Sequence, residues 1–391
     1  MANEATPEKL ARVHIYEIDL IRAITVFSVV AIHSLSATTF LVPKPASSVQ
    51  LLNLIIHALH YNREMFMFVT GLVLTFVYFR KQFSVKKFWI KRMLLVLVPY
   101  IVWTGIYVKI NNPDAGLSQY LNLSLTNVLT GNASYQLYYI LLAVQFYLVF
   151  PLFLWFLKKV AHHPWLTLSI SLVLQLIAMY IDFTYFQTNA IQTPFVTQFL
   201  LPYQDRIFIS YQFFFFFGAF AAIYMNAAAT FLKKYGVLSL LFLILVLALF
   251  SVDFSYHINT LHQSMWYAMS VLQPSVVIYS IVAIIFFSWL ALLWAKQKKL
   301  YWLVKSISDV SFGVYFVHVF LLTLVVSYVV PLFQTVVPVP ITILITVLCT
   351  FIASVVFCFI LLKVPLLSWT IGRARPLWKT KKVSPDYAKP I

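Results

Sequence analysis

Residues 17–36 read EIDLIRAITVFSVVAIHSLS, an apolar run that is long enough to cross a lipid bilayer as one helix. Similar runs of about 20 residues recur along the whole chain. This run nevertheless contains Asp19, Arg22 and His33. Ionisable side chains inside a bilayer cost a few kcal/mol each, so those that persist are the first candidates for function.

The composition excludes an ordinary soluble protein. The 391 residues are 62% hydrophobic and 10% charged, with a mean hydropathy of +0.88. Long uninterrupted apolar runs predict helices and not the short alternating strands of a transmembrane barrel. We therefore expect an all-α integral membrane protein. Its ten predicted spans are 16–40, 51–79, 88–109, 136–157, 165–185, 207–226, 236–255, 273–295, 308–330 and 339–363.

The basic residues predict the orientation. With the N-terminus in the cytosol, 24 of the 28 Lys and Arg residues fall on the cytoplasmic side, and both termini lie there. The chain then divides into a cytoplasmic segment 1–15, a membrane domain 16–365 and a basic cytoplasmic tail 366–391. Because the basic residues lie beside helix ends, the net charge of +17 indicates contact with lipid headgroups and not nucleic acid. Cys349 and Cys358 both lie in the last span, so we expect no metal site.

Arg22 and His33 lie on one face of the first span. Their separation of 11 residues brings them within about 20° of each other and roughly 16 Å apart along the helix. Asp19 precedes Arg22 by three residues and is expected to pair with it. His33 can exchange a proton near neutral pH. The simpler alternative is that Arg22 reaches lipid headgroups while His33 bonds a neighbouring helix, but the shared face favours a functional site.

Several segments together resemble the membrane acyltransferase type 3 family. The first is IDLIRAITVFSVVAIH, in which ten residues stand between Arg22 and His33. In the family's order follow FMFVTGLVL at 66–74, FWIKRMLLVLVPYIVW at 88–103, YQLYYILLAVQFYLVFPLF at 135–153 and SISDVSFGVYFVHVFLL at 306–322. The resemblance covers about residues 15–365.

The resemblance implies a multi-pass acyltransferase of the bacterial cell membrane. Such enzymes move an acyl group, most simply acetyl, from a cytosolic acyl-CoA co-substrate to a hydroxyl of a cell-surface or secreted carbohydrate, and they hold no permanently bound cofactor. Gln136, Leu137, Tyr138 and Tyr139 stand where the family often has His-Leu-Trp-Tyr. Together with Leu95, which stands where the third-helix motif often has a second arginine, this difference suggests a branch that modifies biofilm glycans or wall polymers.

The resemblance also assigns roles to the polar residues. Arg22 and Arg92 are expected to hold the donor phosphates. Leu95 stands where the family motif often has a second arginine, so Lys91 and Lys87 are the expected further contacts. His33 would act as general base on the acceptor hydroxyl or, alternatively, as a nucleophile that carries the acyl group.

Glu64 is the nearest expected partner that could orient His33, since a catalytic base is normally held by a carboxylate or another polar group. Its neighbour Arg63 could equally neutralise it in a purely structural pair. His57 and His60 lie in the same outer segment, and a loop histidine is more often solvated than catalytic.

Two further spans carry candidates for substrate binding. In the fourth span these are Tyr138, Tyr139 and Gln145, although aromatic residues near an interface more often anchor a helix in the membrane. In the ninth span they are Tyr315 and His318. In the outer loop, Arg206 pairs most simply with Asp205.

A glycan exporter or flippase is the alternative from another functional class. Such proteins often show internal repeats and helices broken near the midplane. Only 8 glycines occur in the chain, and the early spans lack paired Gly/Pro interruptions, which counts modestly against transport.

Overall fold

The computed structural model describes residues 14–42, 46–82, 84–188 and 190–373. Helices make up most of these ranges, and they contain no strand. The all-α fold class is therefore confirmed. The longer helices are α1 (Tyr16–Ala37), α2 (Ala46–Ala58), α3 (Asn62–Tyr78), α4 (Val85–Asn111), α5 (Leu117–Thr130), α6 (Tyr138–Val160), α7 (Pro164–Ile181), α8 (Gln212–Ile223), α9 (Met225–Ser255), α11 (Pro274–Gln297), α12 (Tyr301–Leu324) and α14 (Val339–Lys363), and the shorter ones are α10 (Met265–Ala268) and α13 (Val330–Phe333).

Within the described ranges, eight helical segments are long and apolar enough to cross a membrane. They begin at Tyr16, Val85, Tyr138, Pro164, Met225, Pro274, Tyr301 and Val339. Each backbone bond inside such a helix is satisfied by its own helix, as hydrocarbon surroundings require. The protein is thus a multi-pass membrane protein.

The other two predicted spans correspond to interrupted or short helices. The range 51–79 is divided into α2 and α3 by a tight turn, Leu59–Tyr61. The range 207–226 contains a similar turn, Phe208–Tyr211, followed by the 12 residues of α8. The total of ten spans and the cytoplasmic location of both termini therefore remain predictions.

Helix α5 was not among the predicted elements, because its sequence LSQYLNLSLTNVLT is too short and polar to resemble a span. It packs beside α4, where the Tyr100 hydroxyl donates to the carbonyl oxygens of Asn127 and Val128 at 3.2 and 2.8 Å. Gly131 ends α5 with a positive φ of 75°.

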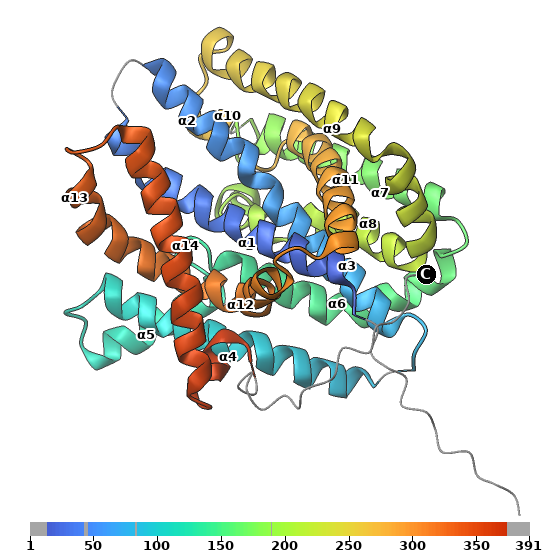
Figure 1. Cartoon of the computed structure of the whole chain (residues 1–391), viewed down its shortest axis with the longest axis horizontal. Helices are drawn as coiled ribbons and strands as arrows, with labels where there is room; N and C mark the ends of the chain where they lie inside the picture. Colours follow the sequence, from blue (N-terminus) through green and yellow to red (C-terminus); the bar gives the residue numbers. More distant parts are fainter. Residues whose placement is uncertain (1–13, 43–45, 83, 189, 374–391) are drawn as a thin grey trace, which may run out of the picture.

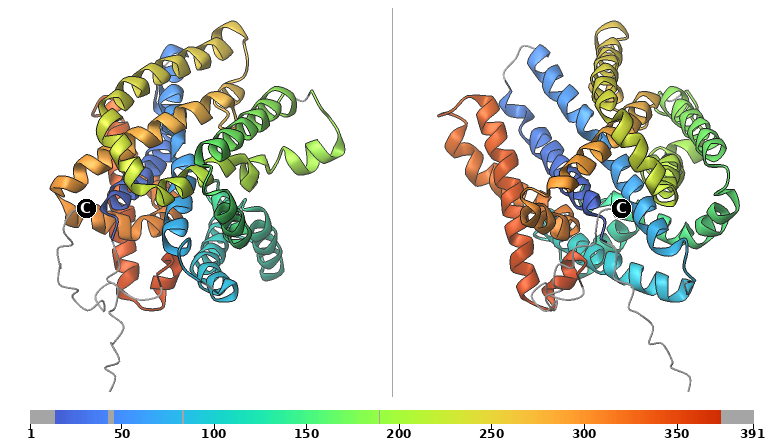
Figure 2. Two further views of the ribbon diagram at one scale, coloured as in Figure 1. Left: turned by 90° about the vertical axis from the view of Figure 1, so that its right-hand side faces the viewer. Right: turned by 45° about the vertical axis from the view of Figure 1, so that its right-hand side comes forward.

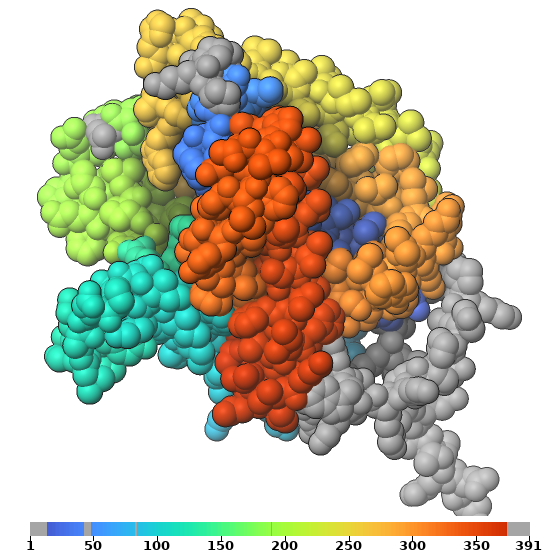
Figure 3. Space-filling model, turned by 60° about the vertical axis from the view of Figure 1, so that its left-hand side comes forward, coloured from blue at the N-terminus to red at the C-terminus, as the bar shows by residue number. Residues whose placement is uncertain are grey.

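Helix α1 lies in the middle of the bundle, between α12 and α14 on one side and α3 and α11 on the other (Figure 1). Most of its residues are buried although it is a membrane-spanning candidate. The segment α13–α14 and the α7 region lie on opposite sides of the molecule (Figure 2). In Figure 3 the orange and red segment that ends in α14 covers part of the blue N-terminal helices. The polar residues of α1 therefore face protein and not lipid.

Helices α1 and α12 run in the same direction. Near their N-terminal ends the Ser308 hydroxyl donates to Asp19 Oδ1 at 2.8 Å. In their C-terminal halves the rings of His33 and His318 stack. This parallel arrangement is the one that the predicted first and ninth spans require.

Helices α3 and α8 cross very closely, because each has a glycine at the contact. A Cβ atom at Gly71 would lie 2.2 Å from the Phe215 carbonyl oxygen, and one at Gly218 would lie 1.9 Å from the Phe68 carbonyl oxygen. Small residues of this kind permit close helix packing in membranes. The crossing fixes α3, which begins with the buried residues Arg63 and Glu64.

The described start of the predicted tail belongs to the folded body. Residues Leu367–Ile371 form a short turn of helix, η9, that packs against α4, α12 and α14. The Trp103 indole of α4 donates to the Thr370 carbonyl oxygen at 2.9 Å. Residues 374–391 lie outside the described ranges.

Candidate functional site

The predicted ion pair between Asp19 and Arg22 is wrong. Asp19 is buried and bonds in another direction, toward α12 and the start of the chain. Its Oδ2 lies 2.6 Å from His14 Nε2, and its Oδ1 accepts from Ser308 and lies 4.0 Å from Lys305 Nζ. Residues three apart on a helix differ by about 60° in direction, so Asp19 faces α12, and no described carboxylate forms a direct ion pair with Arg22, although Asp19 stays within electrostatic range of it.

Besides Asp19, two other arginines lie within electrostatic range of Arg22, namely Arg92 of α4 and Arg373 after η9. The guanidinium carbon of Arg92 is 5.7 Å from the centre of the Tyr147 ring, and Tyr147 is also in range of Arg22. The Arg92 Nε is buried and has no hydrogen-bond partner among the described residues. One end of the bundle thus collects positive charge from three separate segments.

Lys87 and Lys91 differ from Arg92 in their position on α4. Both are exposed, whereas Arg92 is partly buried and Phe88, one turn before it, is buried. Ser84 caps the helix here, since its hydroxyl accepts from the Lys87 amide at 3.4 Å. The two lysines therefore lie on the outward side of α4, and a role for them at the donor phosphates stays a prediction.

His33 lies between two other rings in the opposite half of α1. Its centroid is 5.2 Å from that of His318 in a stacked arrangement and 4.6 Å from that of Tyr135 in a tilted one. The two histidines, which are 285 positions apart in sequence, thus share one site. His33 remains partly exposed, while His318 is fully buried.

The tautomer of His318 follows from its contacts. Its Nδ1 lies 2.9 Å from the Tyr315 carbonyl oxygen and 3.1 Å from that of Val314. Carbonyl oxygens only accept, so Nδ1 carries the proton and Nε2 keeps its lone pair. Nε2 has no partner among the described residues. The ring next to His33 thus keeps a buried nitrogen with a free lone pair.

A cavity of about 450 Å³ lies on the far side of Tyr135, and neither His33 nor His318 is among its lining residues. Its size is in the range of small-molecule sites. Tyr135 lines it and also contacts His33. Its other lining residues are uncharged, and they are Tyr107, Ile110, Asn111, Asn132, Ala133, Ser134, Val319, Phe320, Thr323 and Leu324. The lining combines aromatic faces with amide and hydroxyl groups, which suits a neutral polar ligand.

Glu64 is buried, and its Oε2 has no partner among the described residues. It forms no direct ion pair with Arg63, whose Nη1 donates to the Tyr138 hydroxyl at 3.2 Å instead. Of the two residues Arg63 and Glu64, it is Arg63 that lies within electrostatic range of His33. The purely structural Arg63–Glu64 pair is therefore not formed by direct contact, and an orienting role for Glu64 stays a prediction.

His57 is buried in the protein, and His60 is partly buried. Gln273 Nε2 donates to His57 Nε2 at 2.9 Å, and the His57 ring stacks on Phe250 at 4.4 Å. His60 lies in the turn between α2 and α3, and its Nδ1 is buried without a partner in the described chain. His57 thus has a packing role, while His60 adds an unpaired atom near His33.

The candidates of the fourth span separate into different positions. Gln145 is fully engaged with the loop after residue 205, since it donates to the Arg206 carbonyl oxygen at 2.6 Å and accepts from the Phe208 amide at 3.2 Å. It does not line the cavity described above. Arg206 bonds Asp205 at 3.2 Å, which confirms that predicted pair.

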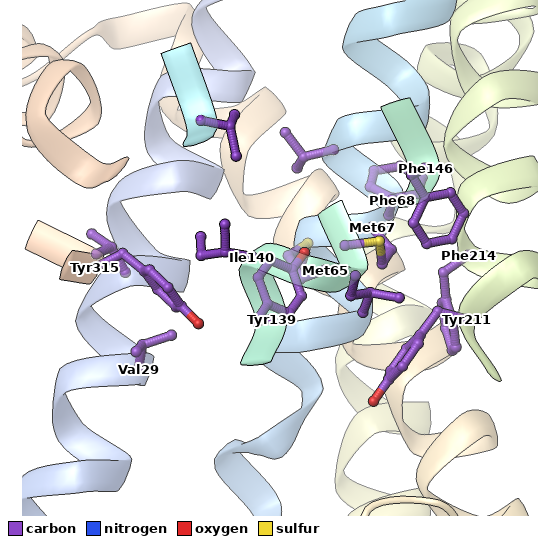
Figure 4. Packing of buried hydrophobic residues seen from close by; sticks show 14 of the residues in the cluster. Val29, Met65, Met67, Phe68, Tyr139, Ile140, Phe146, Tyr211, Phe214 and Tyr315 are labelled. Carbon is purple, nitrogen blue, oxygen red and sulfur yellow. The ribbon is translucent and has the colours of Figure 1, made fainter. Parts of the chain in front are cut away.

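Tyr139 and Tyr315 lie together in the protein interior, with ring centroids 5.9 Å apart (Figure 4). Figure 4 shows Tyr315 extending from α12 toward the space in which Tyr139 lies. The Tyr315 hydroxyl donates to the Gln136 carbonyl oxygen, which ties α12 to the residues that precede α6. The Tyr139 hydroxyl is buried and has no partner in the described part of the chain.

Sequence reasoning missed four contributors. Tyr135 is the first residue of the segment 135–153 that resembles the family, but we assigned it no role. The feature that could have indicated one is its position directly before the polar start of the fourth span. Lys305 and Asp309 are charged residues four apart at the start of α12, and they form an ion pair. Arg373 binds the same Asp309, but nothing in the local sequence indicates that the chain returns to this point.

Comparison with known proteins identifies the family. A family model described as an acyltransferase domain matches residues 15–363, which is most of the chain. No curated protein and no solved structure matches it. The matched range begins just before α1 and ends with α14, so it contains the His33 and His318 pair together with Arg22 and Arg92. The chain therefore belongs to the membrane acyltransferase type 3 family.

Proposed function

We propose that this acyltransferase moves an acyl group, most simply acetyl, from a cytosolic acyl-CoA to a hydroxyl of a cell-surface carbohydrate at the bacterial cell membrane. One observation carries the proposal. Helix α1 contributes Arg22 to the cluster of arginines and His33 to the ring pair beside the cavity. A single buried helix thus joins a cationic site to a neutral polar site.

The cationic site suits the donor. Neither Arg22 nor Arg92 forms a direct ion pair with a described carboxylate, and phosphate oxygens form strong charge-assisted hydrogen bonds with guanidinium groups. Along α1 the 11 residues from Arg22 to His33 correspond to roughly 16 Å. An extended pantetheine arm has a similar length, so the thioester would reach His33 while the nucleotide stays at the arginines.

His33 carries the chemistry in either of two ways. As general base it takes the proton of the acceptor hydroxyl while the oxygen bonds to the acyl carbon, and the carbon–sulfur bond breaks to release CoA, whose sulfur receives the proton. As nucleophile, a ring nitrogen bonds to the acyl carbon while the carbon–sulfur bond breaks and CoA leaves as the thiolate. The acceptor oxygen then bonds to the acyl carbon, the carbon–nitrogen bond breaks, and the hydroxyl proton passes to the CoA sulfur. The accessible ring beside the unpaired His318 Nε2 suits both routes.

The cavity suits the acceptor. Its amide, hydroxyl and aromatic groups resemble the contacts that bind sugars, and no charged side chain lines it. Tyr135 connects the cavity with His33, because it borders both. In the predicted orientation this end of α1 faces the outside of the cell, where surface glycans are found. Membership of the acyltransferase family favours this function over the exporter.

The test uses two measurements. First, purified protein in liposomes is given acetyl-CoA with a labelled acetyl group and a neutral oligosaccharide, and we expect label on the sugar. Second, the surface polysaccharides of cells with and without the gene are compared by mass spectrometry, and we expect the loss of an acyl mass. Loss of surface polymer without any mass change would support the exporter instead.

A further inference from the structure

Arg373 lies outside the residues that the family model matches, yet the fold brings it to the arginine cluster. The turn η9 reverses the chain, and Gly372 follows it with a positive φ of 71°. A Cβ atom on Gly372 would lie 3.0 Å from the Leu95 carbonyl oxygen of α4. Arg373 thus begins beside Leu95, close to one helical turn beyond Arg92.

The contacts of Arg373 hold it against the N-terminal half of α12. Its Nε donates to the Asp309 carbonyl oxygen at 3.0 Å, and its Nη2 donates to Asp309 Oδ1 at 3.0 Å. Lys305 pairs with the same carboxylate and also approaches Asp19. The side chain is therefore ordered at this place by a shared acid.

Among the described residues, the charges of this region do not balance. Arg92 and Arg373 each lie within electrostatic range of Arg22, and Lys305, which approaches Asp19, adds a fourth positive charge. Asp19 and Asp309 supply two negative charges. Like charges held this close repel one another, and part of Arg92 is buried without a hydrogen-bond acceptor. An anion with two or more charges would relieve the repulsion and supply the missing acceptors.

We propose that Arg373 is a third ligand of the donor phosphates, next to Arg22 and Arg92. Position 95 of α4 is a leucine and offers no guanidinium. Arg373 brings one to the neighbourhood of Leu95 from the C-terminal segment. This inference rests on the proposed acyl-CoA donor. Asp309 orients Arg373, and the phosphate oxygens bind donors of its guanidinium that Asp309 leaves free.

The test measures binding of CoA and of pantetheine, which lacks phosphate, to the purified full chain by calorimetry. The main variant is Arg373→Gln, which keeps a donor for the Asp309 carbonyl oxygen but removes the charge. The matched control is Lys296→Gln, which removes one charge from an exposed residue in the last turn of α11. Arg373→Lys is the second variant, and it keeps the charge without the bidentate geometry.

We expect Arg373→Gln to weaken CoA binding by about tenfold or more, as for the loss of a charge-assisted hydrogen bond, and to leave pantetheine binding unchanged. The CoA affinity of Arg373→Lys should lie between those of Arg373→Gln and the wild type. The CoA affinity of Lys296→Gln should match that of the wild type. If Arg373→Gln does not fold, unchanged CoA affinity in Arg373→Lys overturns the assignment.

Two other results contradict the inference in different ways. Wild-type affinity of Arg373→Gln for CoA, or an equal loss for CoA and pantetheine, would show that Arg373 does not bind phosphate, while the proposed function would stand. Failure of the wild-type protein to bind CoA at all would contradict the proposed donor, and the role of Arg373 with it.

Discussion

The imidazole rings of His33 and His318 stack with their centroids 5.2 Å apart, although the residues belong to the first and the ninth predicted spans. The Nδ1 of His318 is fixed by two backbone carbonyl oxygens, so this ring is the more rigid of the two. The His318 ring therefore supports His33 through the stacking contact, and its Nε2 is buried without a partner among the described residues.

We predict that His318→Ala lowers kcat and leaves the KM for acyl-CoA unchanged. An aromatic pair contributes about 0.5–1.5 kcal/mol, which corresponds to a loss of up to about tenfold if this energy keeps His33 oriented. His318→Gln, whose amide lies near the Nε2 position, should recover more activity than His318→Asn. Equal activity of the Asn and Gln variants would argue that Nε2 has no role.

Tyr135 is predicted to control acceptor binding, because it borders both the cavity and His33. Tyr135→Ala should raise the KM for the acceptor severalfold, to about tenfold at most, without a change in the KM for acyl-CoA. Tyr135→Phe keeps the ring and should remain near the wild type. Steady-state kinetics with each substrate varied in turn make the measurement, with the exposed Tyr256→Ala as control. A change confined to the donor KM would contradict this placement.

Asp19 is predicted to stabilise the contact between α1 and α12. Asp19→Ala removes the acceptor of the Ser308 hydroxyl and the partner of His14, and we expect a loss of about 1–3 kcal/mol in stability. Asp19→Asn keeps the shape and one acceptor, so its loss should be smaller. Thermal unfolding in detergent, compared with the exposed Asp114→Ala, measures the effect. A loss no larger than that of the control would show that this network does not stabilise the fold.

The close crossing of α3 and α8 is predicted to tolerate no added side chain. Gly71→Ala places a Cβ atom 2.2 Å from the Phe215 carbonyl oxygen, so the helices must move apart, at a cost of about 1–3 kcal/mol. At Gly116 a Cβ atom would meet nothing within 4 Å, and Gly116→Ala serves as the matched control. Thermal unfolding of both variants decides the point, and equal midpoints would mean that the crossing is looser than described.

Much of the fold follows from the sequence, because a bilayer imposes long apolar helices on the chain. The predicted span 16–40 corresponds to helix α1, Tyr16–Ala37. The predicted span 339–363 corresponds to helix α14, Val339–Lys363. The predictions were poorest where helices are short or polar. Helix α5 has no membrane-spanning length, and the turn Leu59–Tyr61 divides a run that looks continuous in the sequence.

The candidate site was predicted in part. The 11-residue spacing indicated that Arg22 and His33 share a helix face, since this depends only on helical periodicity. The partners of each residue depend on which helices pack together, which the local sequence does not contain. Asp19 therefore turned out to bind α12, and Arg373 joined the cluster through a chain reversal at Gly372.

The central claim is that His33 performs acyl transfer. Its most direct test compares the wild type with His33→Ala and with His162→Ala, a control in which an exposed histidine between α6 and α7 is removed. Transfer of labelled acetyl from acetyl-CoA to the acceptor and binding of CoA are measured on the same purified samples.

We predict that His33→Ala loses transfer by at least about a hundredfold, as for the removal of a general base, while its CoA affinity stays that of the wild type. The control should keep both properties. Full transfer by His33→Ala would contradict the account.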